Sequence, residues 1–190
     1  MLRGERVLLR ARTRADVERM YELEADPEHK MLADTRPWVP YSLATVLEQW
    51  DRRHADGPPS WNENFIPFAV DSLATGEMIG GCVLWELDQH NRNAHFGLEL
   101  LPAARGQGYG TDVVRVLCDY AFRVLGLHRV QLETLARNTA MRKAALAAGF
   151  QEEGMLRATG WVGTGWDGDV VYGLLAREWR SLRSEVPTQS

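Results

Sequence analysis

The sequence predicts one α+β domain, a three-layer arrangement in which helices cover the faces of a central mixed sheet. Residues 65–72 (FIPFAVDS), 78–88 (MIGGCVLWELD) and 94–101 (AHFGLELL) read as three consecutive strands joined by short connections. The third strand passes through a glycine-rich turn into an amphipathic helix over 111–124. Consecutive antiparallel strands followed by a strand–turn–helix unit are typical of a sheet with helices packed on its faces.

The N-terminal third is expected to hold one strand and two helices. Residues 5–12 (ERVLLRAR) form the opening strand, and Thr13 is a plausible N-cap for a helix over 14–26, with Asp16 placed as in a capping box. Asp26-Pro27 should end that helix. The prolines and aromatics of 30–41 indicate an ordered loop. Ser42 should cap a second helix that reaches about Arg53, and 56–64 reads as another loop.

The C-terminal part alternates strands with a helix. Residues 128–136 (HRVQLETLA) alternate as a strand, and Asn138 occupies an N-cap position. The following helix should end at Gly149, which suits a left-handed C-cap. Two final strands are expected at about 151–161 and 169–176.

Composition limits the classes of function. A chain of 190 residues with a net charge of −4 suggests one domain, placed at 1–183, and gives no basic face for nucleic acid. No apolar run approaches the ~20 residues of a membrane helix, and no signal-peptide core opens the chain, so we expect a cytoplasmic protein without a membrane partner. Cys82 and Cys118 should be reduced, the histidines show no metal-binding spacing, and the tail 184–190 should be disordered.

The turn Arg105-Gly106-Gln107-Gly108-Tyr109-Gly110 is the most informative motif. Its alternating glycines let backbone N–H groups approach a ligand closely, next to the free donors at the start of the following helix. Such a turn suits a phosphate or pyrophosphate. A dinucleotide fingerprint would need glycine at Thr111, and a Walker loop would need Gly-Lys-Ser/Thr, so neither matches.

Arg-x-x-Gly-x-Gly at a strand-to-helix junction resembles the acyl-CoA pyrophosphate loop of the GNAT superfamily of N-acetyltransferases. The stretches ERVLLRARTRAD, FAVDSLATGEMIGG, ARNTAMRKAALAAGFQEEG and WDGDVVYGLLAREW resemble its Rim-type branch, the ribosomal-protein-alanine N-acetyltransferases and their relatives. In the last stretch Asp169, Tyr172 and Trp179 match the closing strand of that branch. Together these segments cover most of residues 1–180.

The resemblance implies a mostly antiparallel sheet of about seven strands whose fourth and fifth strands splay apart around acetyl-CoA. It implies that the phosphates lie on 105–110, that pantetheine runs along Leu100 and Leu101, and that Asn138 flanks the cofactor. Backbone N–H groups near Leu100 or Leu101 would meet the oxyanion. Arg105 and Arg142 are candidate phosphate contacts.

Transfer of an acyl group to a primary amine needs a base to take the amine proton. Strand alternation places His95 and Glu99 on the face opposite Phe96, Leu98 and Leu100, so both are candidate bases. The positions where relatives carry a tyrosine or serine acid hold Ala145 and Met141. Either the thiolate leaves unassisted, or Tyr109 donates a proton, or the protein binds acyl-CoA without catalysis.

The acceptor is a protein N-terminus or a small-molecule amine, and a larger donor such as succinyl-CoA is an alternative to acetyl-CoA. Three tryptophans in Pro/Gly-rich loops, where a core role is less natural, are candidates for the wall of the acceptor pocket. They are Trp38, Trp61 and Trp166. The sequence allows a monomer or a homodimer.

Overall fold

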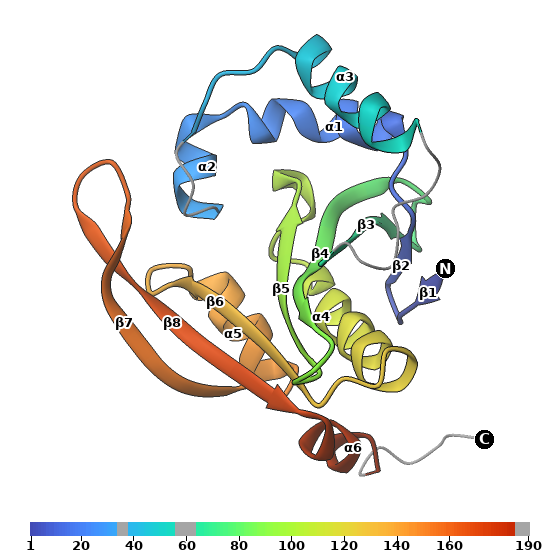
Figure 1. Ribbon diagram of the computed structural model, residues 1–190, viewed down its shortest axis with the longest axis vertical. Coiled ribbons are helices and arrows are strands. Elements are labelled where there is room, and N and C mark those ends of the chain that lie inside the picture. Colours follow the sequence, from blue (N-terminus) through green and yellow to red (C-terminus); the bar gives the residue numbers. More distant parts are fainter. Residues whose placement is uncertain (34–37, 56–63, 185–190) are drawn as a thin grey trace.

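The computed structural model describes residues 1–33, 38–55 and 64–184 of the chain (Figure 1). Eight strands form one sheet in the order β1-β2-β3-β4-β5-β6-β8-β7. Neighbouring strands pair antiparallel except β5 and β6, which are parallel. The eight strands are β1 (Leu2–Arg3), β2 (Val7–Arg10), β3 (Phe65–Ser72), β4 (Met78–Asp88), β5 (Asn93–Leu100), β6 (Arg129–Leu135), β7 (Gln151–Trp161) and β8 (Trp166–Leu175).

The sheet has one strand more than the sequence predicts. The extra strand is β1, which folds back on β2 with Leu2 opposite Leu9. The Asp112 carboxylate holds this turn, because it accepts hydrogen bonds from the backbone N–H groups of Arg6 and Val7 at 2.7 and 3.1 Å. Asp112 lies in the first turn of the helix after the glycine-rich loop. The contact therefore joins the N-terminus of the chain to the start of that helix, more than 100 residues later.

In the described part of the chain, six α-helices surround the sheet, and four of them are close to the predicted ranges. They are α1 (Arg14–Glu24), α2 (Pro27–Ala33), α3 (Leu43–His54), α4 (Tyr109–Asp119), α5 (Thr139–Ala147) and α6 (Ala176–Ser184). A π-helical turn, Tyr120–Val124, extends α4 to the end of the predicted range 111–124. The short 3-10 helix η1 (Pro102–Ala104) leads into the glycine-rich loop.

The prediction of a loop from residue 30 onward was wrong for the residues of α2. Asp26-Pro27, which we expected only to end a helix, also begins one. The Asp26 side chain accepts from the Glu28 N–H at 3.0 Å, its carbonyl accepts from the Lys30 N–H at 2.9 Å, and proline favours the first helical position. At the other end, Trp179 lies in α6, a helix that we did not predict.

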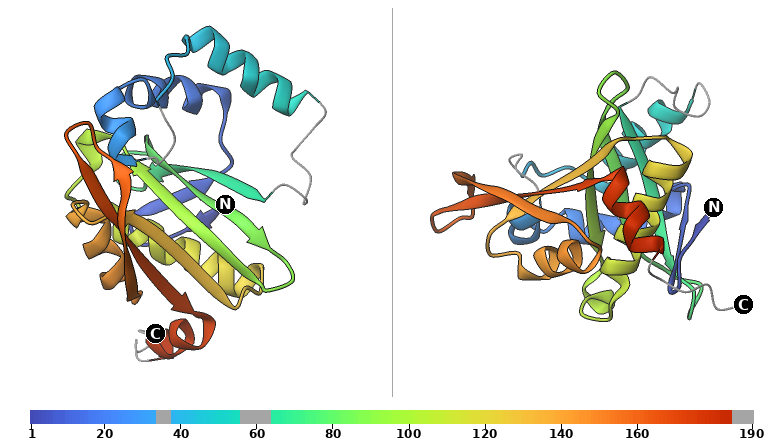
Figure 2. Two further views of the ribbon diagram at one scale, coloured as in Figure 1. Left: turned by 60° about the vertical axis from the view of Figure 1, so that its left-hand side comes forward. Right: turned by 90° about the horizontal axis from the view of Figure 1, so that it is seen from below.

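The two faces of the sheet carry different helices. The main core lies beneath α4 and α5 and includes Leu84, Phe96 and Val113. A smaller cluster on the opposite face joins Met20 of α1 to Ala69 and Met78. Figure 2 shows this layering from two further directions, and the long β7–β8 hairpin that projects beyond the rest of the sheet.

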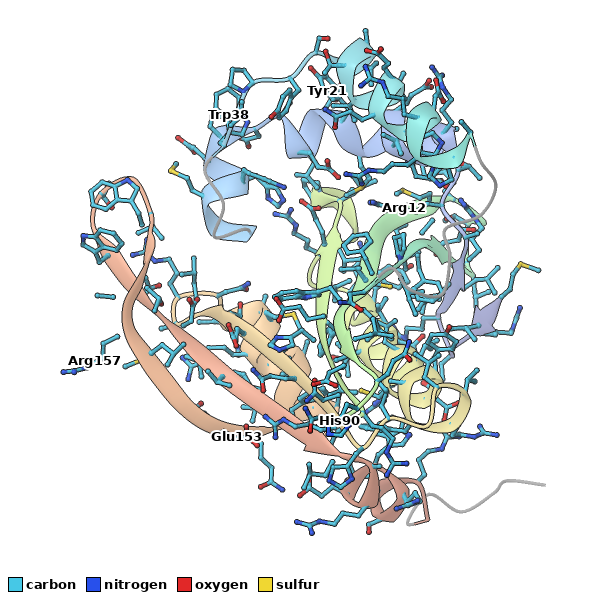
Figure 3. All side chains as sticks on the ribbon, in the orientation of Figure 1. Arg12, Tyr21, Trp38, His90, Glu153 and Arg157 are labelled. Atoms are coloured by element: carbon cyan, nitrogen blue, oxygen red, sulfur yellow. The ribbon has the colours of Figure 1, made fainter. Side chains whose placement is uncertain are left out.

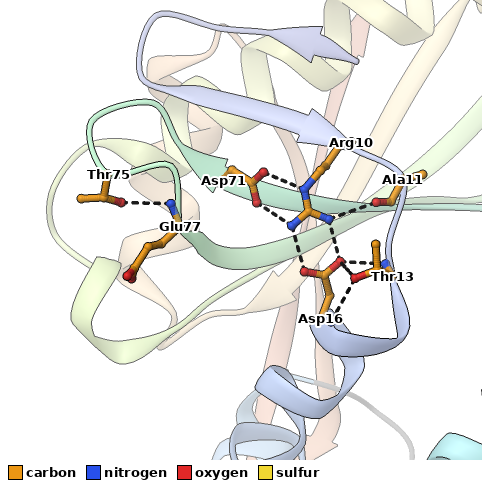
Figure 4. Close-up of polar contacts among 7 residues, drawn as sticks. All are labelled: Arg10, Ala11, Thr13, Asp16, Asp71, Thr75 and Glu77. Atoms are coloured by element: carbon orange, nitrogen blue, oxygen red, sulfur yellow. Dashed lines mark hydrogen bonds and ion pairs between the residues drawn. The ribbon is translucent and has the colours of Figure 1, made fainter.

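Arg10 fastens α1 to the sheet (Figure 4). Its guanidinium donates to Asp16 at 2.6 Å and to Asp71 of β3 at 2.6 Å. Thr13 and Asp16 form the predicted capping box, with Asp16 N–H to Thr13 Oγ1 at 3.3 Å and Thr13 N–H to the Asp16 carboxylate at 2.7 Å. The capping box and the Arg10 bonds therefore fix the start of α1 against the sheet.

Candidate active site

The predicted fourth and fifth strands, β5 and β6, splay apart as expected. Their pairing is confined to Asn93–His95 of β5, opposite Arg129–Gln131 of β6, while both strands continue beyond (Figure 1). The N–H of Leu101 donates to Ile79 of β4 at 2.9 Å. Because alternate residues of an antiparallel strand bond to the same neighbour, the backbone groups of Leu98 and Leu100 turn toward the gap. The gap therefore offers a free strand edge to an extended ligand.

The expectation for the oxyanion donor is corrected in one detail. Leu101 cannot supply its N–H to a ligand without losing its bond to Ile79. Leu98 and Leu100 are left to face the gap, with the Leu100 carbonyl accepting from Arg105 Nε at 2.9 Å.

The glycine-rich loop lies directly after this strand edge. Gly106 and Gly108 have φ of 73° and 82°, left-handed values that glycine adopts without strain. The first bond of α4 runs from the Asp112 N–H to the Gly108 carbonyl at 3.4 Å. Within the described residues, the N–H groups of 106–111 donate to no protein acceptor. These free donors, at the positive end of a helix, fit a diphosphate.

Side chains and a carbonyl group anchor the loop, so that its backbone N–H groups stay free. Gln107 donates its side-chain amide to the Ala103 carbonyl at 2.6 Å, and Arg6 donates to the Gln107 carbonyl at 3.0 Å. The Tyr109 hydroxyl bonds with Ser72 Oγ of β3 at 3.1 Å. Since β3 lies two strands from β5, this hydroxyl is directed away from the gap as the structure stands.

Glu99 and Arg105 are brought together by a residue that sequence analysis missed, His29 of α2. His29 Nε2 forms a short hydrogen bond with Glu99 Oε1, and the Arg105 guanidinium lies 3.4 Å from His29 Nδ1. Both partners of the first contact are mostly buried, with side-chain exposures of 14% and 23%. A single residue of α2 thus contacts both β5 and the first residue of the glycine-rich loop.

Glu24 at the end of α1 belongs to the same cluster. Burial raises the pKa of its carboxyl, and the nearby Glu99 raises it further, while Arg12, Lys30 and His29 oppose both effects. Arg12 Nη2 lies 4.0 Å from Glu24, and Figure 3 places Arg12 between α1 and the sheet. A glycine at 81 makes room for this guanidinium, since a Cβ there would lie 2.8 Å from Arg12 Nη2.

His95 lies at the closed end of the gap, on the last paired residue of β5. Its ring packs against Trp85 at a centroid distance of 4.7 Å, and its Nε2 lies 3.7 Å from the Glu86 carboxylate. Its Nδ1 is buried and has no hydrogen-bond partner. An open hollow of about 490 Å³ adjoins the ring, lined by His95 together with Asn64, Glu86, Leu87, Asp88, Gln89 and Asn93.

The predicted faces of β5 are confirmed. Leu98 and Leu100 lie next to Gly110 of α4, and Phe96 packs against Phe150 at 5.4 Å. Glu99 faces α2 instead. The two faces of β5 therefore turn toward different helices, α4 on one side and α2 on the other.

Asn138 and Arg142 have protein partners. The Asn138 side chain caps α5, accepting from the Met141 N–H at 3.1 Å and donating to Thr134 at 3.0 Å. Arg142 Nε donates to the Tyr172 hydroxyl at 3.0 Å, a bond that raises the pKa of the guanidinium. Their predicted contacts with the cofactor remain predictions.

Among the described residues, the lining of the hollow beside His95 includes neither Trp38 nor Trp166, so the predicted tryptophan wall stays a prediction. Trp38 follows α2 (Figure 3), and Trp166 sits on the β7–β8 hairpin, edge-to-face with Trp161 at 5.5 Å. Trp61 lies outside the described residues. Ala145 is fully buried and Met141 packs against the core, so neither position supplies an acid.

Two residues of the site escaped sequence analysis for different reasons. His29 lies between the predicted helix over 14–26 and the predicted loop over 30–41, so it had no assigned element. Glu86 lies on the predicted strand 78–88 and was given no role. The signal for Glu86 was its position next to Trp85, inside a strand that faces His95 across the hairpin.

A splayed parallel pair, a free strand edge and a glycine-rich loop with free amides are the features expected of an acyl-CoA-dependent N-acyltransferase. The family model of the acetyltransferase (GNAT) domain matches residues 6–151. The chain belongs to this family, and its similarity to the putative ribosomal N-acetyltransferase YdaF of Bacillus subtilis places it in the Rim-type branch. The two are 31% identical over 182 residues, 93% of this chain and 94% of YdaF. The protein is an N-acetyltransferase that uses acetyl-CoA and an amine.

Other relatives agree with this assignment. The uncharacterized N-acetyltransferase p20 of Bacillus licheniformis is 28% identical over 154 residues, 80% of this chain and 83% of p20. The fold is also that of the Vibrio cholerae spermidine N-acetyltransferase solved with CoA and spermine. That structure has a TM-score of 0.78 and 22% identity, and covers 92% of this chain and 98% of its own.

Among the described residues, no helix is long and apolar enough to cross a membrane. In the same part of the chain, no three His, Cys, Asp or Glu side chains are grouped to hold a metal ion.

Proposed function

We propose that the acceptor is a small cationic amine, and that His95 is the general base. The observation that carries the proposal is the position of His95, at the closed end of the gap and on the wall of a hollow with two carboxylates, Glu86 and Asp88. A cationic acceptor would be attracted to this hollow, and His95 Nε2 faces it while Nδ1 is buried.

The distance along β5 supports His95 over Glu99. His95 and Leu100 are five strand residues apart, roughly 17 Å at ~3.3 Å per residue. An acyl-CoA with its diphosphate on 105–110 and its extended arm on Leu100 and Leu98 would carry the thioester toward His95. Glu99 then lies beside the arm, where it would hold the acceptor rather than take its proton.

The proposed reaction is a direct transfer in a ternary complex. The amine nitrogen forms a bond to the thioester carbon, and His95 Nε2 takes one amine proton. The Leu98 or Leu100 N–H stabilises the oxyanion, and the C–S bond breaks to release CoA as a thiolate. No acid is assigned, because the usual positions hold Ala145 and Met141 and the Tyr109 hydroxyl is bonded to Ser72.

The names of relatives define the acceptor panel. One is a putative ribosomal N-acetyltransferase, and another is the spermidine N(1)-acetyltransferase of Vibrio cholerae, 30% identical over 117 residues.

The buried thiols of Cys82 and Cys118 support a reducing cytoplasmic setting for the reaction. The continuous sheet supports one domain over 1–183.

A screen that measures CoA release tests the proposal. Acetyl-CoA and succinyl-CoA are each offered with polyamines, neutral monoamines and peptides with free N-termini. We expect turnover with acetyl-CoA and a polyamine, at a kcat/KM at least tenfold above that for neutral amines. His95→Gln should lose roughly 10²-fold in kcat, the scale of a general base, while exposed His128→Gln should lose nothing. Faster turnover of peptides, or full activity in H95Q, would overturn it.

A further inference from the structure

Strand β4 carries one extra residue at the point where it passes His95. Trp85 pairs with His95 and Asp88 pairs with Asn93, so three steps on β4 match two on β5. Leu84 is fully buried in the main core, and Leu87 packs against the same core. Two residues rather than one separate these core-facing leucines. The strand therefore contains a bulge, and Glu86 is free to leave the core face that regular alternation would give it.

Glu86 adopts a backbone conformation that favours glycine. Its φ is 49°, in the left-handed region, where a side chain with a Cβ is strained. This backbone conformation brings the Glu86 carboxylate to 3.7 Å from His95 Nε2. Bulges recur beside active sites, where they re-aim one side chain.

We propose that Glu86 is a positioning residue for His95, and that the strained bulge keeps its carboxylate beside the nitrogen that receives the amine proton. This inference rests on the proposed function of His95. At 3.7 Å the contact is too long for a hydrogen bond, and it becomes an ion pair only when the imidazole is protonated, so its effect is electrostatic. A carboxylate at this distance stabilises the imidazolium that forms as the amine is deprotonated.

Other charged groups near His95 are engaged elsewhere. Asp88 on β4 shares the hollow, but accepts hydrogen bonds from the Asn91 N–H and side chain at 2.8 and 2.6 Å. On β6, Gln131 lies opposite His95 and bonds Arg129 and Glu133 at 3.0 and 2.9 Å. Glu99 is four residues along β5 and bonds His29.

The chain offers a matched control for the backbone strain. Ala158 has φ of 54° inside the irregularity of β7 between Leu156 and Gly160. Replacing either residue by glycine removes the same kind of strain. Only the change at 86 also removes a carboxylate from beside His95.

The experiment compares Glu86→Gln, Glu86→Gly and Ala158→Gly with the wild type, using acetyl-CoA and the best amine from the screen. Glu86→Gln and Glu86→Gly should lower kcat several-fold with a smaller change in the amine KM. Both glycine variants should raise Tm by a few degrees, while Ala158→Gly keeps the wild-type kcat and amine KM.

The outcomes separate the two proposals. An unchanged kcat in both Glu86 variants would overturn the role of Glu86. A change confined to the amine KM would also overturn it, and would assign Glu86 to acceptor binding alone. Full activity in His95→Gln would instead reject the proposed base.

Discussion

His29 on α2 and Glu99 on β5 form a hydrogen bond that joins α2 to the edge of the gap. The two residues are 70 positions apart in the chain, and Arg105 reaches the other nitrogen of the same imidazole at 3.4 Å. His29 thus contacts Glu99 with one ring nitrogen, while Arg105 of the loop before α4 contacts the other. This arrangement predicts that α2 contributes to acceptor binding without touching the thioester.

Replacing His29 by alanine should lower kcat/KM for the amine by about tenfold, because a hydrogen bond to a charged group contributes ~1.5–3 kcal/mol. The Kd of acetyl-CoA, measured by calorimetry, should change much less. His29→Gln keeps a donor and should recover part of the loss. Exposed His128→Ala is the control. If His29→Ala matches the wild type with every amine, Glu99 needs no partner.

The free amides of the glycine-rich loop predict a second result. Gly106 and Gly126 have φ of 73° and 65°, and an added Cβ would meet nothing within 4 Å at either site. Alanine at either position should therefore cost a similar ~1–2 kcal/mol in the free energy of unfolding. Only Gly106→Ala should weaken acetyl-CoA binding, by tenfold or more, since residue 106 belongs to the row of free N–H donors. Equal Kd values for the two variants would argue against a diphosphate on this loop.

Local signals predicted most of the fold. The hairpin of β3 and β4 was placed at its observed bounds, and α5 begins after Asn138 as its N-cap position indicates. Such signals lie within a few residues of the element they define. Pro27 shows their limit, because a proline that ends one helix can also begin the next, and sequence alone did not distinguish the two cases.

The site was only partly predictable for a related reason. The loop 105–110 and the two faces of β5 follow from short motifs and alternation. The partners of Glu99 and His95 do not, since His29 arrives from a distant helix and Glu86 depends on a bulge in β4. A single inserted residue leaves no clear mark in a strand whose side chains are apolar on both sides of it.

The Arg10 cluster predicts how stability depends on pH. Burial disfavours the charged Asp16 carboxylate, but hydrogen bonds from Arg10 and Thr13 outweigh it and lower the pKa of Asp16 from 3.8 to about 2. A carboxyl whose pKa is depressed by folding stabilises the protein above its unfolded pKa, and this contribution is lost as pH falls through the folded pKa. Stability should therefore fall between about pH 4 and pH 2.

Urea denaturation at pH 5, 4, 3 and 2 measures this effect. Asp16→Asn should be less stable than the wild type at pH 5, and the difference should shrink toward pH 2 as the wild-type carboxyl becomes protonated. Asp51→Asn, on the exposed pair with Arg14, should show little difference at any of these pH values. A constant difference for Asp16→Asn across the range would show that its charge is not what joins α1 to β3.

The two cysteines allow the transfer reaction to be followed directly. Cys82 and Cys118 are buried in the main core, and burial raises the pKa of both thiols well above its ordinary value. Because the thiolate is the reactive form, a disulfide reagent such as DTNB should label neither thiol in the folded protein and two per chain in denaturant. Every thiol that appears during turnover of the folded enzyme would then come from CoA. Rapid labelling of the folded protein without substrate would show that the core beneath α4 opens.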